Sequence, residues 1–364
     1  MTELVDDGPN PGAEPRTVGP KDPDATQSMD KGQWMELVAP FRGADTRRSV
    51  IQLTLTVVCF AAFWSLAFLS LEWHYGVTLL FAVPTAGFLM RLFLIQHDCG
   101  HGSYFLSRRA RDTVGFMIGV LLLTPYQYWR RTHAYHHAHS GDLDFRGFGD
   151  VDTLTVREYQ GLSLLRRIGY RLYRHPLILL SVGPLFHFLI KHRYPWDIPK
   201  TWKQAWASVW WTNLALVGVV IVASLTIGLQ RFFLVQAPVT VVASAAGVWL
   251  FYVQHQFEET YWHRHESWDY FDSAVQGSSH LALPRPLAWL TAHIGIHHVH
   301  HLSALVPNYR LAECLDANPE FGRATTLRIR DTVGLFRLTL WDEDSERLIG
   351  FSDLRKGRRA RRAA

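Results

Sequence analysis

Residues 75–101 read YGVTLLFAVPTAGFLMRLFLIQHDCGH, an apolar run that ends in two histidines four residues apart. Between Tyr75 and Gln96 the single charged side chain is Arg91, near the far end, where a long side chain can snorkel to the membrane surface. A helix of this length crosses a bilayer, which takes about 20 residues. Because a helix rises about 1.5 Å per residue, His97 should emerge near the membrane surface.

Three further stretches have the length and composition of a membrane span. Ser49 to Leu71 contains 23 residues without a charge. Ala205 to Gln230 and Phe232 to Phe257 are uncharged and separated by one residue, Arg231. We expect the turn between them near residues 228–238. One such stretch would also fit a buried core helix, but four of them predict an all-α integral membrane protein with four transmembrane helices in two hairpins.

The composition agrees with a membrane protein and excludes several other classes. Charged residues make up 19% of the chain, below the roughly 25% of soluble domains. At 48% hydrophobic residues the chain is neither disordered nor fibrous. Three widely spaced cysteines, Cys59, Cys99 and Cys314, exclude a disulfide scaffold and a cysteine-rich zinc module. The formal net charge of +5 does not require a nucleic-acid partner, and we expect none.

The placement of Lys and Arg predicts the orientation. The link Glu72-Trp73-His74 carries neither residue, whereas residues 104–207 carry fifteen, and residues 355–362 form a basic run. Cytoplasmic loops hold the excess of Lys and Arg, so both termini and the histidine clusters are expected in the cytoplasm. The chain divides into a disordered polar leader without a cleavable signal peptide (1–33), a membrane domain (34–320) and a basic cytoplasmic C-terminal tail (321–364).

Two shorter apolar stretches, Val114 to Tyr126 and Leu177 to Ile190, cannot span a bilayer comfortably. We expect them to form interfacial or re-entrant helices beneath the bundle. The segments that carry the histidine clusters should form a helical cap on the cytoplasmic side.

The 19 histidines are clustered. Three clusters repeat a spacing of three or four residues, which places side chains on one helix face. His255 belongs to no cluster, but it ends the fourth span at the level where His97 ends the second, and ionisable groups at such places are candidate ligands. The predicted metal ligands are His97, His101, His133, His136, His137, His255, His297, His300 and His301.

Nine imidazoles exceed the coordination of one ion, because zinc takes four ligands and an octahedral ion about six. The pattern therefore predicts two ions, and imidazole suits iron, zinc, copper and nickel alike. Nearby carboxylates could accept the second ring N–H of a ligand. The candidates for this role are Asp98, Asp142, Asp144, Glu258 and Glu259.

The three histidine boxes are His-x3-His at 97–101, His-x2-His-His at 133–137 and His-x2-His-His at 297–301. Together with the two hydrophobic hairpins that divide them, they resemble the membrane fatty acid desaturase superfamily over residues 45–315. The first box, HDCGHGS at 97–103, is similar to that of the acyl-lipid Δ12 (omega-6) branch. Supporting phrases are SGDLD at 140–144, QHQFE at 254–258 and PNYR at 307–310. His293 departs from the pattern, which has a short polar or acidic residue there.

This resemblance implies a cytoplasmic di-iron site that uses molecular oxygen and two external electrons to remove hydrogen from neighbouring methylene groups, leaving a cis double bond. The substrate would be a membrane lipid or an acyl thioester. His175-Pro176 lacks the flanking glycines of a cytochrome-b-type haem domain, and no cysteine cluster could hold an iron–sulfur centre. A separate ferredoxin or cytochrome-type electron donor is therefore implied.

Two other functions remain open from the sequence. The same metal chemistry supports a hydroxylase of an alkane, a carotenoid or a sterol, which product analysis separates from a desaturase. A membrane metal transporter or sensor could also be rich in histidine. Transporters place their ligands near the bilayer midplane, whereas these clusters are predicted at one face.

Overall fold

The computed structural model describes residues 31–354. Most of the predicted leader and the basic run 355–362 lie outside the described residues. The four longest helices are α2 (Thr46–Leu69), α3 (Tyr75–His101), α9 (Lys203–Thr226) and α10 (Leu229–His255). Each is long and apolar enough to cross a membrane, which confirms the predicted spans to within a few residues.

Local signals set the ends of these helices. The Asp45 side chain accepts a hydrogen bond from the Arg48 backbone N–H (3.1 Å) and caps the start of α2. Gly102 ends α3 with φ of 83°, a left-handed conformation that favours glycine. Gly228, with φ of 84°, separates α9 from α10 inside the predicted turn region.

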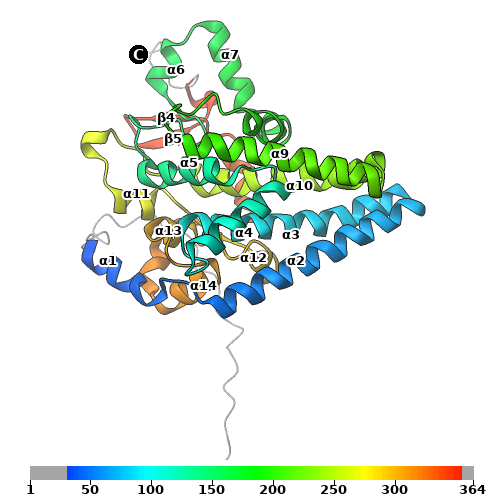
Figure 1. Ribbon diagram of the computed structural model, residues 1–364. Coiled ribbons are helices and arrows are strands. Elements are labelled where there is room, and N and C mark those ends of the chain that lie inside the picture. Colours follow the sequence, from blue (N-terminus) through cyan, green and yellow to red (C-terminus); the bar gives the residue numbers. More distant parts are fainter. Residues whose placement is uncertain (1–30, 355–364) are drawn as a thin grey trace, which may run out of the picture.

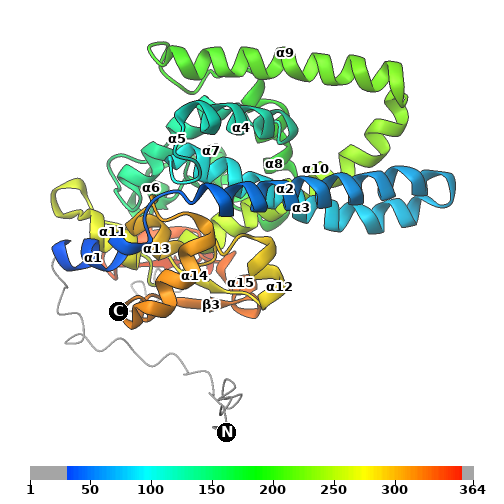
Figure 2. The same cartoon turned by 60° about the horizontal axis from the view of Figure 1, so that its bottom comes forward.

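Figure 1 shows the two hairpins side by side, with both tips at the same end of the molecule and the cap at the other. Within the bundle α3 packs against both α2 and α10. It is the most enclosed of the four, with 61% of its apolar window buried. The view in Figure 2 shows α9 standing further from the others. The central position of α3 delivers the first histidine box to the middle of the cap.

The expectation that Arg91 snorkels to the membrane surface is wrong. Arg91 is 5% exposed, and its guanidinium donates to the Trp289 carbonyl and lies 4.1 Å from the centre of the Trp289 ring. A polar group inside an apolar bundle requires a partner, and the short helix α12 (Arg285–Leu290) supplies one.

The two shorter apolar stretches are largely helical. The first is divided between α4 (Arg108–Leu121) and α5 (Tyr126–His139), with Leu123 between them at φ of 56°. The second forms the π-helix η4 (Ile178–Val182) followed by α8 (Gly183–Leu189).

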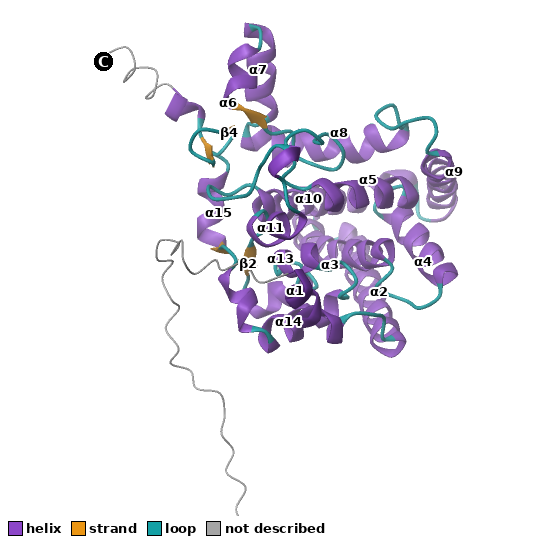
Figure 3. Ribbon diagram, turned by 90° about the vertical axis from the view of Figure 1, so that its left-hand side faces the viewer, coloured by secondary structure: helices purple, strands orange, loops and turns teal. Residues whose placement is uncertain are grey.

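Short helices make up most of the cap (Figure 3). They are α1 (Lys31–Val38), α6 (Val156–Gly161), α7 (Leu164–Tyr173), α11 (Tyr270–Gln276), α13 (His297–Leu302), α14 (Asn308–Ala317) and α15 (Ile329–Leu335). Short 3-10 segments in the cap are η2 (Ala39–Phe41), η6 (His265–Ser267) and η7 (Pro319–Arg323). Two further 3-10 turns lie elsewhere: η3 (Ser70–Glu72) connects α2 to α3 at the tip of the first hairpin, and η5 (Lys191–Arg193) lies between α8 and α9.

Within residues 31–354, five very short strands connect the C-terminal part of the chain to the cap. β2 (His280–Ala282) pairs in parallel with β3 (Thr326–Arg328). β4 (Leu340–Asp342) pairs in parallel with β1 (Leu154–Thr155) and antiparallel with β5 (Arg347–Ile349). The described part of the predicted tail therefore packs on the domain that precedes it.

Candidate metal centre

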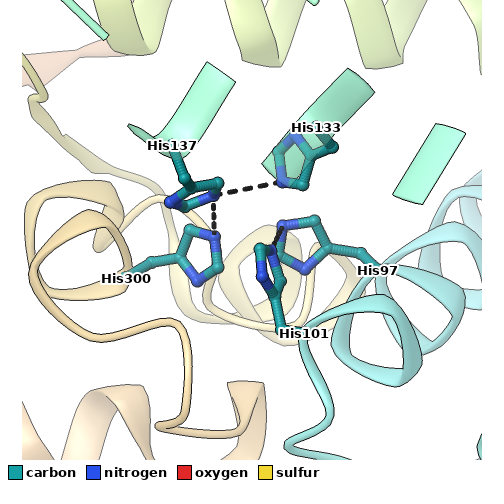
Figure 4. Close-up of side chains that lie close together, drawn as sticks. All are labelled: His97, His101, His133, His137 and His300. Carbon is teal, nitrogen blue, oxygen red and sulfur yellow. Dashed lines mark hydrogen bonds between the residues drawn. The ribbon is translucent and has the colours of Figure 1, made fainter. Parts of the chain in front are cut away.

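Five histidines from three helices converge beside the end of α3 (Figure 4). α3 contributes His97 and His101, α5 contributes His133 and His137, and α13 contributes His300. One ring nitrogen of each lies within 4.8 Å of the others. The Nε2 atoms of His97 and His101 are 3.3 Å apart, and those of His137 and His300 are 3.1 Å apart. We call this group the first cluster.

A second cluster lies next to the first. His136, His255 and His301 again bring one ring nitrogen each to within 4.8 Å. The His255 Nε2 atom is 3.2 Å from that of His136 and 2.9 Å from that of His297, so His297 completes the cluster. The clusters adjoin, because the rings of His137 and His301 stack with their centres 4.2 Å apart. The structure thus brings all nine predicted histidines together.

Helical spacing explains how a few helices bring so many histidines to the two clusters. In α5, His133 and His137 face the first cluster, while His136 faces the second. In α13, His300 and His301 divide in the same way. The start of α13 is fixed by a close approach at Gly295, where a Cβ atom would lie 2.4 Å from the Leu281 carbonyl oxygen of β2. Only glycine allows this contact.

Burial favours the neutral form of five of the clustered histidines. Desolvation lowers the pKa of His133, His137, His297, His300 and His301 well below the usual value, and the neighbouring imidazoles lower it further. A neutral imidazole carries a lone pair on one ring nitrogen, as a metal ligand requires. The Nε2 atom of His301 is buried without a hydrogen-bond partner among the described residues.

Three of the histidines are oriented through the other ring nitrogen. The Nδ1 atom of His97 lies 3.1 Å from a carboxylate oxygen of Asp98. His136 makes the same type of contact with Asp150, and the Nδ1 atom of His255 is 3.2 Å from the Gly277 carbonyl oxygen. With the proton on Nδ1, each ring presents the Nε2 lone pair to its cluster, which is the usual arrangement around metals.

One of the five candidate carboxylates contacts a cluster histidine, and the other four do not. Asp98 contacts a cluster histidine, whereas Asp142 accepts from His265 and Asp144 pairs with Arg264. Glu258 pairs with Arg347, and Glu259 is exposed. Asp150 was not among the candidates; it lies fourteen residues after His136 and reaches it through a loop.

The remaining histidines take no part in the clusters. His293, which departs from the family pattern, is half-buried and lines a separate cavity of about 200 Å³ together with His280. His265 is bound to Asp142. Neither belongs to the two groups within metal-ligand distance.

The donor set fits two metal ions. At a metal–nitrogen distance of about 2.0–2.1 Å, two ligands of one ion lie roughly 3 Å apart. The close Nε2 pairs are 2.9–3.3 Å apart. Five nitrogens in one cluster and four in the other leave room at each ion for a further ligand.

The family model for fatty acid desaturase matches residues 72–332, which include all nine histidines. The chain belongs to the fatty acid desaturase family. With its four membrane-spanning helices, this desaturase is an integral membrane oxidoreductase.

Three relatives show the range of similarity. A fatty acid desaturase of Bacillus subtilis is 42% identical over 319 residues, 88% of this chain and 90% of the relative. The sn-1 oleoyl-lipid 12-desaturase of Synechocystis is 25% identical over 232 residues, 60% of this chain and 62% of the relative. The sn-1 acyl-lipid omega-3 desaturase (ferredoxin) of Nostoc is 27% identical over 249 residues, 62% and 63% of the two chains.

Proposed function

We propose that this desaturase introduces a cis double bond into the acyl chain of a membrane lipid with a centre of two iron ions. The observation that carries the proposal is the pair of adjoining histidine clusters at one end of a membrane bundle. In this proposal the first cluster holds one ion and His136, His255, His297 and His301 hold the other. Bound iron would supply dioxygen reduction and the removal of hydrogen from unactivated methylene groups, which side chains alone cannot perform.

The protein itself orients the imidazole rings and encloses the site. Asp98, Asp150 and the Gly277 carbonyl hold three imidazoles with Nε2 toward the centre. The side chains of α13 are buried, which keeps water from the third box. A substrate dissolved in the bilayer reaches such a site along the membrane, which gives a reason for an enzyme with four spans.

Electrons come from a separate donor in this proposal. The overall reaction consumes the saturated acyl segment, O2, two electrons and two protons, and it yields the unsaturated chain and two molecules of water. The name of the Nostoc relative includes ferredoxin, and a ferredoxin or cytochrome-type protein is the proposed donor here. The excess of Lys and Arg on the cap side supports a cytoplasmic site with both termini on that side.

The finer proposal places the new bond at the Δ12 position of an oleoyl-type chain. It rests on the amino-acid sequence of the first box and on the 12-desaturases among the more distant relatives. The test is expression, with a functional electron donor, in a host that makes only saturated and monounsaturated lipids. The proposal expects new dienes in the mass spectrum of the acyl chains. A new monoene at another position would refute Δ12 alone, and a hydroxylated product or unchanged lipids would refute desaturation.

A further inference from the structure

The helix α7 exposes an apolar face outside the four spans. Each residue of a helix turns the chain by about 100°. On this basis four apolar side chains of α7 share an arc of about 100° on the helical wheel. They are Leu164 (75% exposed), Leu165 (79%), Ile168 (46%) and Leu172 (58%). Tyr170, on the opposite side, is buried against the cap. The helix is therefore amphipathic, but its apolar face points away from the protein.

The axis of α7 runs in a different direction from the membrane spans. Figures 1 and 3 both show α7 running crosswise to the spans and standing outside the bundle. In Figure 1 it lies level with the ends of α2 and α9 nearest the cap. A helix that lies in the plane of a bilayer surface has this position relative to membrane spans.

Buried contacts hold α7 in this direction. The Tyr170 hydroxyl donates to the Thr339 carbonyl (2.6 Å). Arg174, which follows the helix and is 2% exposed, donates to the Gln256 side chain (2.8 Å) and to the Tyr252 hydroxyl (3.2 Å). Tyr252 and Gln256 flank His255 on α10, so α7 has a fixed place relative to the second cluster.

We propose that α7 is an interfacial anchor whose apolar face is inserted into the lipid leaflet on the cap side. Its occupant is the bilayer, because the exposed apolar surface continues through Leu177, Val182, Phe186 and Leu189. These residues belong to the segment of η4 and α8, which contacts α7 at one end and packs against the span α10. Arg167 and Arg171 lie along one edge of the apolar face, where they donate to the Leu162 carbonyl and the Tyr159 hydroxyl. The anchor sets the level of the membrane surface relative to His255.

The test measures the depth of two neighbouring positions in the full-length protein. Leu165→Cys and the matched control Arg166→Cys lie on different sides of α7, and both positions are exposed. Each variant is labelled with an environment-sensitive fluorophore and reconstituted in phosphatidylcholine nanodiscs, with and without brominated acyl chains. One set of discs holds a single chain per disc, and a second set holds two. Unsubstituted protein treated in parallel gives the background from Cys59, since Cys99 and Cys314 are buried.

The proposal expects blue-shifted emission at position 165 that brominated lipid quenches, and water-like emission at 166 that it quenches far less. Water-like emission at 165, or equal quenching at both positions, would overturn it. A blue shift at 165 that appears only when two chains share a disc would show that a second copy covers this face, which would also overturn it.

Discussion

Replacing Asp98 by Asn should weaken iron binding because it disturbs the proton on one ligand. One carboxylate oxygen of Asp98 lies 3.1 Å from His97 Nδ1. The other accepts two hydrogen bonds of 2.7 Å, from the backbone and the side-chain amide of Asn308. Asp98 is 2% exposed, so water cannot replace these partners. It thereby links the first histidine box to the start of α14.

An amide at this position cannot accept hydrogen bonds from both His97 and Asn308. If its oxygen stays with Asn308, its NH2 group faces His97 Nδ1, which must then accept and leave the proton on Nε2, where no metal can bind. If the amide turns round, two buried donors of Asn308 lose their acceptor. Either outcome costs about 1–3 kcal/mol, in line with the roughly 10- to 100-fold loss of metal affinity when such partners are removed.

The measurement is anaerobic iron titration of purified Asp98→Asn in competition with a chromophoric chelator. Asp142→Asn is the matched control, because Asp142 is also fully buried and accepts from a histidine, His265, that lies outside both clusters. We expect 10- to 100-fold weaker binding for the first variant and unchanged binding for the second. Unchanged affinity in Asp98→Asn, or an equal loss in both, would refute the reasoning.

Three further predictions concern the same centre. His255→Gln should abolish desaturation at normal protein levels while His265→Ala retains most of it, as lipid analysis of expressing cells would show; near-normal activity of His255→Gln would remove His255 from the ligand set. Gly295→Ala should destabilise the protein by about 1–3 kcal/mol, because its Cβ atom would meet the Leu281 carbonyl, and an unchanged thermal midpoint would contradict this. Metal analysis of active protein should find close to two iron atoms per chain, and a single zinc with iron-independent activity would be incompatible with the proposal.

The features that could be predicted from the sequence are those that a helix encodes in its own spacing. Apolar length gave the four spans, and spacing of three or four residues gave the histidines of the three boxes. His255 required one further step, the depth at which a span ends. The strands of two or three residues could not be predicted, because segments such as β1 have no periodicity of their own and are defined only by their partners.

The carboxylate partners show why the rest of the site could not be read in the same way. Asp142 and Asp144 stand close to the second box in sequence, yet they face His265 and Arg264. Asp150 stands further away and contacts His136, because the loop that follows α5 folds back. A local sequence pattern does not indicate which distant residue a loop will contact. The clustered histidines are thus placed by rigid helices, whereas two of the groups that orient them, Asp150 and the Gly277 carbonyl, come from connecting segments. It follows that changes in those segments can alter metal affinity while the three histidine boxes stay intact.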